Sequence, residues 1–179
     1  SYALKMFKQI VSEYPGTEVS KEALLAIKNI YVEIDSVENF FVYVKTLPFE
    51  SGITNSEEDS LRYVSIENKY MEGVSCEVLV EEFESYLKKF EYPIFEINAH
   101  FYSADCYLKM KRYEDAIKSY ELILSKSVNQ FSERSAYNLG CIYYNVKKDY
   151  INSLRVYHIL RNVSETKDNI MVGSIGIIR

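Results

Sequence analysis

Few side chains in this 179-residue sequence combine in a pattern that could perform catalysis or bind a metal. The two histidines, His100 and His158, belong to different helical patterns. A metal site needs several histidine, cysteine or carboxylate ligands at suitable spacing, and a nucleophilic pair needs a cysteine near a histidine. The sequence supports neither arrangement, so we expect both imidazoles to lie on helix faces or in the core.

Two further patterns could suggest chemistry but fit a structural role better. Glu81, Glu82 and Glu84 share a helical pattern with a strongly apolar face, which indicates a solvated acidic surface rather than a catalytic pair. Gly173-Ser-Ile-Gly176 lacks the preceding strand and the third glycine of a phosphate-binding loop. We therefore predict a protein that is not an enzyme and that binds no cofactor and no metal.

The three cysteines, Cys76, Cys106 and Cys141, form no CxxC pair, and their odd number does not suggest a disulfide framework. We expect free thiols, with Cys106 and Cys141 buried beside apolar residues.

Net charge is −5, with 9 Lys/Arg against 17 Asp/Glu in residues 1–93 and 12 against 9 in residues 94–179. A chain without a basic stripe is a poor candidate for nucleic-acid binding.

Hydrophobic periodicity predicts a helical protein throughout. Six glycines and three prolines are too few for an all-β protein with many tight turns. The pattern Asn98–Leu124 shows two amphipathic helices that meet at a turn near Lys111-Arg112. The other expected helical segments are 2–14, about 17–34, 36–47, 54–70, 75–91, 132–145, 150–160 and one from about 166 onward. Thr17 or Ser20, Ser36, Ser75 and the capping box Thr54–Glu57 mark expected helix starts.

These helices repeat along the chain. Tyr31, Tyr70, Tyr107 and Tyr143 recur at intervals of 39, 37 and 36 residues, each in the first helix of a pair. The second helices align through Ala3, Phe40, Leu79, Ala116 and Ser153, and through Phe7, Val44, Phe83, Tyr120 and Tyr157. Stacked hairpins repeat on such a period. We predict one domain, 1–179, of partial repeat 1–15, repeats 16–49, 54–93, 94–129 and 130–163, and partial repeat 164–179.

The repeat resembles the tetratricopeptide repeat family, whose helix pair of about 34 residues carries a W-x₂-L-G-x₂-Y…A-x₃-F…P pattern. Leu139-Gly140 with Tyr143 and Ala116 with Tyr120 fit this pattern, and Pro15, Pro48 and Pro93 fall near its terminal proline. The family tryptophan is absent, and the Leu-Gly pair is degenerate in three repeats, at Ile27-Lys28, Ile66-Glu67 and Ser103-Ala104. The resemblance implies an all-α, right-handed solenoid of helix-turn-helix hairpins.

Within that family, segments 7–33 and 83–120 are similar to repeats of bacterial envelope proteins, most of all those of Bacteroides-type bacteria. The resemblance implies a concave groove lined by the first helices. Groove positions in the two best repeats are Asn98, Phe101, Asp105, Lys109, Arg134, Tyr137, Cys141, Tyr144 and Asn145, and earlier ones are Leu25, Asn29, Leu61, Val64 and Asn68. The lysine places of the family's carboxylate clamp hold Leu25, Val64, Phe101 and Tyr137, so an acidic chaperone tail is not expected.

These features predict a non-catalytic scaffold that binds a peptide or protein segment in its groove, in the assembly of a bacterial envelope. The periplasm or the periplasmic face of the outer membrane is the expected location. Alternatives are a sensor or regulatory segment of a cytoplasmic signalling protein and a carbohydrate-binding helical repeat. The loop Phe49–Asn55 is read as an inter-repeat connection, with a functional loop as the alternative.

Both ends of the chain lie inside helical patterns, which predicts a fragment of a longer protein. No signal peptide or membrane span is visible, since the late apolar run Ile170–Ile178 is shorter than the roughly 20 residues that a span requires. Exposed apolar faces are expected at Ala3/Phe7 and at Ile170/Ile175. They predict end-to-end self-association through the terminal helices.

Overall fold

The computed structural model describes residues 2–164 and 168–172, and every regular element in these residues is a helix. The all-α, helical-repeat fold predicted from the periodicity is therefore confirmed. Contacts divide the chain into two compact units, Ser1–Met71 and Glu72–Arg179. The helices are α1 Tyr2–Glu13, α2 Glu18–Glu33, α3 Val37–Lys45, α4 Asn55–Met71, α5 Cys76–Lys89, α6 Glu96–Lys109, α7 Tyr113–Ser125, α8 Ser132–Cys141, the π-helix η1 Ile142–Lys147 and α9 Tyr150–Val163.

The first unit contains α1 to α4, in which α1 packs against α2, α2 against α3, and α3 against α4. Its core takes Val11 from α1, Leu24 and Ile27 from α2, and Phe40 and Phe41 from α3. Periodic apolar residues thus supply the buried faces of α1, α2 and α3, as the 3.6-residue repeat requires. The unit boundary falls inside the predicted repeat 54–93, so the pairing of its two helices, and a single solenoid over the whole chain, stay predictions.

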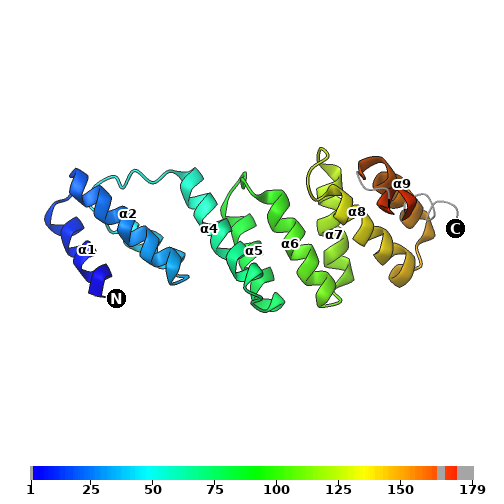
Figure 1. Cartoon of the computed structure of the whole chain (residues 1–179), viewed down its shortest axis with the longest axis horizontal. Coiled ribbons are helices and arrows are strands. Elements are labelled where there is room, and N and C mark those ends of the chain that lie inside the picture. The colour runs from blue at the N-terminus through cyan, green and yellow to red at the C-terminus, as the bar shows by residue number, and fades with distance from the viewer. Residues whose placement is uncertain (1, 165–167, 173–179) are drawn as a thin grey trace. The chain divides into compact units, whose positions relative to one another are not determined.

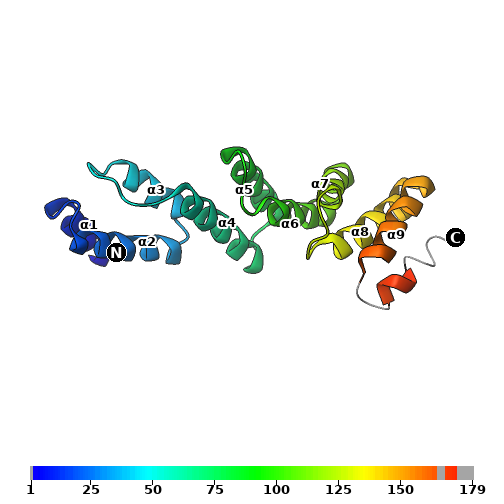
Figure 2. The same cartoon turned by 90° about the horizontal axis from the view of Figure 1, so that it is seen from above.

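The second unit contains two helix pairs, α6 with α7 and α8 with α9, preceded by α5. Figure 1 shows α6, α7 and α8 in succession, and Figure 2 shows α5 and α7 on one side of this unit with α6 and α8 on the other. Fully buried side chains from successive helices form the core: Phe83, Ala104, Tyr120, Leu139, Val156 and Leu160. The first helices α6 and α8 therefore share one side of the unit, as a repeat of hairpins requires.

Two of the predicted helix starts have the expected capping bonds. The Thr17 hydroxyl oxygen accepts a hydrogen bond from the Ser20 amide at 3.2 Å, and Thr54 and Glu57 form the reciprocal capping box. Ser36 and Ser75 occupy the cap positions of α3 and α5 without a side-chain capping bond. The Ser36 hydroxyl instead accepts a hydrogen bond from the side-chain nitrogen Nδ2 of Asn39 at 2.7 Å. Ser36 therefore stands at the predicted start of the helix but does not make the predicted capping bond.

Three of the four equivalent tyrosines make hydrogen bonds at equivalent places between helices. The Tyr107 hydroxyl on α6 donates to Glu84 on α5 at 2.7 Å, and the Tyr143 hydroxyl donates to Glu121 on α7 at 3.0 Å. In the first unit the ammonium of Lys8 donates to the Tyr31 hydroxyl at 2.9 Å. Each bonded partner is the residue that directly follows an aligned position of a second helix, namely Phe7, Phe83 or Tyr120. The spacing of the tyrosines thus reflects a repeated contact between a second helix and the next first helix.

The predicted helix 132–145 differs in its last part, because α8 ends at Cys141 and the π-helix η1 follows. Lys148 then adopts a left-handed backbone with φ of 54°, and its successor Asp149 caps α9 through the Asn152 amide at 3.0 Å. A π-helix rotates the side chains that follow relative to an α-helix. Sequence periodicity did not signal this change.

The terminal faces agree with their prediction only in part. Ala3 is exposed, but Phe7 packs against the core of the first unit. Ile170 is exposed, and Ile175 lies outside the described residues, as do the glycines Gly173 and Gly176.

Alkaline pH tests the tyrosine contacts. Burial, with the hydrogen bond to Glu121, raises the pKa of Tyr143 to about 12, and burial raises that of Tyr157 to about 12. An unfolded tyrosine has a pKa of about 10. Because the folded pKa is raised, the contribution to stability is complete below about pH 10 and is lost as pH rises to about 12. Urea unfolding midpoints should fall steeply across this window. Tyr143→Phe should make the fall shallower, and a midpoint that stays constant up to about pH 12 would contradict the contacts.

Candidate functional site: the exposed face of α6 and α8

The candidate site lies in the second unit, where α6 and α8 present side chains at helical spacing. Phe101, Asp105 and Lys109 are four residues apart on α6 and therefore lie along one stripe of that helix. Arg134 and Tyr137 are three residues apart on α8 and likewise share a face. In the structure Asp105 contacts both Lys109 and Arg134, and Arg134 contacts the Phe101 ring.

A charge cluster organises this face around the buried carboxylate of Asp105. The ammonium of Lys109 lies 3.1 Å from one Asp105 oxygen, and the guanidinium of Arg134 lies 3.6 Å from the other. The Lys109 pair joins residues one helical turn apart, whereas the Arg134 pair joins α6 to α8. Ion pairs with exposed partners add little stability but orient their side chains. Asp105 therefore gives the two cations a common anionic partner.

Stacked aromatic rings pack beneath the exposed guanidinium of Arg134. The Phe101 ring stacks on Phe131 with centroids 4.4 Å apart, and the Arg134 guanidinium lies 5.4 Å from the centroid of Phe101. Tyr102 meets both rings edge to face. Phe101 is only 3% exposed, so it lies beneath the surface and is not the exposed aromatic anchor that its groove position suggested. Its ring instead holds the guanidinium by a cation–π contact.

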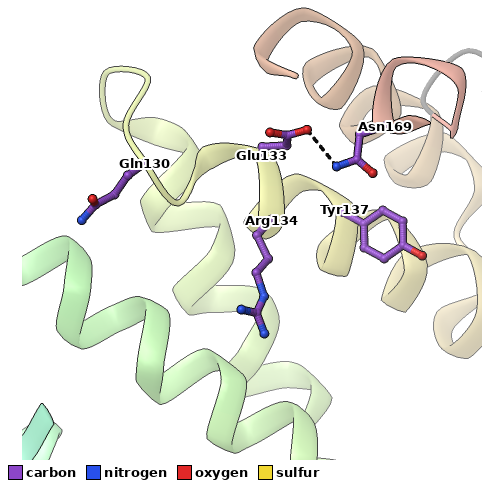
Figure 3. Close-up of a pocket in the computed structure, with 5 residues that line it drawn as sticks. All are labelled: Gln130, Glu133, Arg134, Tyr137 and Asn169. Atoms are coloured by element: carbon purple, nitrogen blue, oxygen red, sulfur yellow. Dashed lines mark hydrogen bonds between the residues drawn. The ribbon is translucent and has the colours of Figure 1, made fainter. Parts of the chain in front are cut away.

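A pocket of about 260 Å³ opens beside Arg134. We call it the Arg134 pocket; it is lined by Gln130, Glu133, Arg134, Tyr137 and Asn169. Figure 3 shows Arg134 and Tyr137 on α8, with Asn169 joined to Glu133 across the pocket. The Asn169 amide donates to the Glu133 carboxylate at 2.8 Å. The side chain of Arg134 is 64% exposed and Tyr137 is 40% exposed, so both can meet a ligand.

The remaining predicted groove residues do not line this pocket. Asn98 is half-buried on α6, and Cys141 is a half-buried free thiol whose pKa is raised by burial. Tyr144 and Asn145 fall in the π-helix, where the Tyr144 ring meets Tyr150 edge to face at 5.5 Å. Their part in partner binding stays a prediction. In the first unit, Leu25, Asn29, Val64 and Asn68 are exposed as expected, whereas Leu61 packs against the core.

Sequence reasoning missed three residues of the Arg134 pocket. Gln130 and Glu133 border the start of α8 and could have been found by extending the groove face one turn toward that start. Asn169 comes from a later helical segment, and no local pattern connects it with α8. Phe131 directly precedes α8, but its contact with the Phe101 ring of α6 joins two helices and has no local sequence signal.

No cluster of three or more histidine, cysteine or acidic side chains that could hold a metal occurs among residues 2–164 and 168–172. His100 is half-buried, and burial lowers the pKa of its imidazole. Cys106 is a buried free thiol whose pKa is raised, chiefly by burial. A thiol that stays protonated is a poor nucleophile, because the thiolate is the reactive form. Across the described helices, none is long and apolar enough to cross a membrane.

Comparison with known families supports the class of fold. The family model described as Tetratricopeptide repeat matches residues 98–127, which contain most of α6 and all of α7. This match supports the resemblance of α6 and α7 to a tetratricopeptide repeat. No curated protein and no solved structure matches the chain.

Proposed function

We propose that the protein is a non-catalytic binding module whose second unit holds a peptide or protein segment on the exposed face of α6 and α8. Proteins built from such repeats generally mediate protein–protein interactions, and stacked helical repeats form extended binding surfaces. The carrying observation is the guanidinium of Arg134, which Asp105 and the Phe101 ring hold in place while its side chain stays exposed beside Tyr137.

This arrangement suits a peptide for a physical reason. An arginine already fixed by a carboxylate and an aromatic ring loses little side-chain entropy when a partner binds. Its free N–H groups can donate to backbone carbonyls or to a carboxylate of the partner, and the exposed ring of Tyr137 offers apolar contact area. Arginine and tyrosine are enriched among residues that dominate binding energy at interfaces.

The test uses a random peptide library displayed on phage and selected against the intact chain. A selected peptide is synthesised, and isothermal titration measures its affinity for wild type, Arg134→Ala and Tyr137→Ala. We expect each variant to weaken binding at least tenfold, or by about 1.4 kcal/mol. Arg161→Ala is the matched control, because Arg161 is an exposed arginine on α9 outside the pocket.

Arg161→Ala should leave the affinity unchanged. Equal affinity of the selected peptides for wild type and for an Arg134→Ala/Tyr137→Ala double variant would overturn the proposal. Far-ultraviolet circular dichroism of each variant separates loss of binding from loss of fold.

We propose a bacterial envelope as the setting, on the strength of the resemblance of segments 7–33 and 83–120 to envelope repeats. Fractionation of the source cells, with an antibody against the chain, tests it. Recovery in the periplasmic or outer-membrane fraction is expected, and recovery in the cytosol would contradict it.

We also propose weak self-association through the exposed apolar side chains of α1 and α9. Tyr2 and Met6 are exposed on α1, and Ile151 and Leu154 are exposed on α9. Light scattering at increasing protein concentration should show a rising mean mass, and Ile151→Lys should suppress the rise. A constant monomer mass at all concentrations would contradict it.

A further inference from the structure

We propose a second binding site, in the first unit, that takes a peptide segment presenting one apolar side chain next to a carboxylate. The site is a pocket of about 180 Å³, which we call the Lys28 pocket. Its walls come from α2, from Phe40 on α3, from the loop between α3 and α4, and from the first turn of α4. The lining residues used below are Lys21, Leu24, Lys28, Phe40, Ile53 and Glu57.

The loop forms a defined wall because its apolar residues are anchored. Phe49 and Ile53 pack against the core cluster of the first unit, which holds the segment down on α2. Gly52 has φ of 74°, a left-handed conformation that glycine adopts without strain. A side chain added at Gly52 would meet nothing within 4 Å, so the glycine serves the turn and not close packing. The insertion Phe49–Asn55 thus links α3 to α4 and also forms one wall of the Lys28 pocket.

The bottom of the Lys28 pocket is apolar and has the size of one side chain. Leu24 and Phe40 are buried core residues that also line the pocket. An apolar cavity of about 150 Å³ accommodates a benzene molecule. A volume of about 180 Å³ therefore fits one group of leucine or phenyl size, and is too small for most free ligands, whose pockets start at about 300 Å³. This size favours a single side chain of a peptide.

The rim carries one cation without a partner. Lys21 pairs with Glu18 at 2.6 Å, and the Glu57 carboxylate accepts from the Thr54 amide at 3.0 Å. The residue Lys28 is half-buried, and within the described part of the chain its ammonium has no ion pair or side-chain hydrogen bond. An ammonium without an anionic partner can pair with an incoming carboxylate through charge-assisted hydrogen bonds.

The repeat pattern places Lys28 at a position that is glycine in the second unit. Lys28 precedes Tyr31 by three residues, as Gly140 precedes Tyr143, so the two hold equivalent places in their first helices. Gly140 lets α8 pack directly against the Tyr157 ring of α9. In α2 the same place carries the charged side chain of Lys28, which lines the pocket. Its positive charge favours an acidic occupant.

The test is an NMR titration of the ¹⁵N-labelled intact chain with three peptides of one length. The probe is acetyl-Ala-Asp-Leu-Asp-Ala-amide, and the matched peptides replace both Asp by Asn, or Leu by Ala. We expect the probe to shift amide signals of Leu24, Lys28 and Ile53. The Asn and Ala peptides should each bind at least tenfold more weakly.

Lys28→Met keeps the length of the side chain and removes its charge, so it should weaken binding of the probe at least tenfold. Lys5→Met removes the same charge from an exposed place on α1 outside the pocket, and should leave the affinity unchanged. Equal binding of the Asp and Asn peptides, or of wild type and Lys28→Met, would overturn the proposal. The peptide comparison needs no variant, so it stands even if Lys28→Met unfolds.

The two proposals fail independently, because the Arg134 pocket and the Lys28 pocket belong to different units. Shifts confined to Arg134, Tyr137 and their neighbours on addition of the probe would count against the Lys28 pocket alone.

Discussion

Phe83→Ala will lower the free energy of unfolding of the second unit by about 3–5 kcal/mol, the range for removing a large aromatic side chain from a core. Phe83 is 0% exposed on α5, and its ring stacks on Tyr102 of α6 at 6.1 Å between centroids. It occupies the second-helix position that Tyr120 and Tyr157 fill in the following repeats. Loss of the Phe83 ring leaves a cavity between α5 and α6, where one repeat packs against the next.

Urea unfolding followed by circular dichroism measures this loss. Tyr92→Ala is the matched control, since it removes an aromatic ring that is 84% exposed and should change stability by no more than about 0.5 kcal/mol. Similar small changes for both variants would show that Phe83 does not join α5 to α6 as the structure has it.

Gly140→Ala will destabilise the protein by about 1–3 kcal/mol, the usual cost of overpacking, although alanine favours helices over glycine by about 1 kcal/mol. An added Cβ at Gly140 would stand 2.8 Å from Cε1 of Tyr157 and 3.2 Å from Cδ1 and Cζ of the same ring. Tyr157 is itself buried against α8, so the ring cannot simply swing away. Close packing therefore outweighs helix propensity at this position.

A double-mutant cycle with Tyr157→Leu checks that cause. The smaller side chain should remove the clash, so Gly140→Ala should cost less in the Tyr157→Leu background than in wild type. Ser85→Ala, at an exposed position inside α5, is the control for propensity alone and should be neutral or slightly stabilising. A stabilising Gly140→Ala would contradict the contact between α8 and α9.

Periodicity was sufficient to predict the helices and the repeat because both depend on local spacing. The recurrence of Tyr31, Tyr107 and Tyr143 corresponds to recurring hydrogen bonds, although the bonded partner changes from Lys8 to Glu84 and Glu121. The repeat thus preserves the place of the contact, whereas the charge of the tyrosine's partner changes from positive in Lys8 to negative in Glu84 and Glu121.

The site was predictable only in part, because its contacts join helices that are distant in sequence. Helical spacing placed Phe101, Asp105 and Arg134 on the first helices, and the structure joins them. Helical spacing could not show that Phe131 would cover the Phe101 ring. Phe101 is therefore buried, and its ring contacts the Arg134 guanidinium instead of meeting solvent. The π-helix likewise altered the setting of Tyr144, since a change of helix type follows from packing rather than from periodicity.

The most direct test of the central claim is NMR mapping of a library-selected peptide on the intact chain. We expect signal changes concentrated at Arg134 and Tyr137 on α8 and at the buried Asp105 on α6, and their loss in Arg134→Ala. Changes confined to α7 and α9, or changes that persist unaltered in Arg134→Ala, would contradict it.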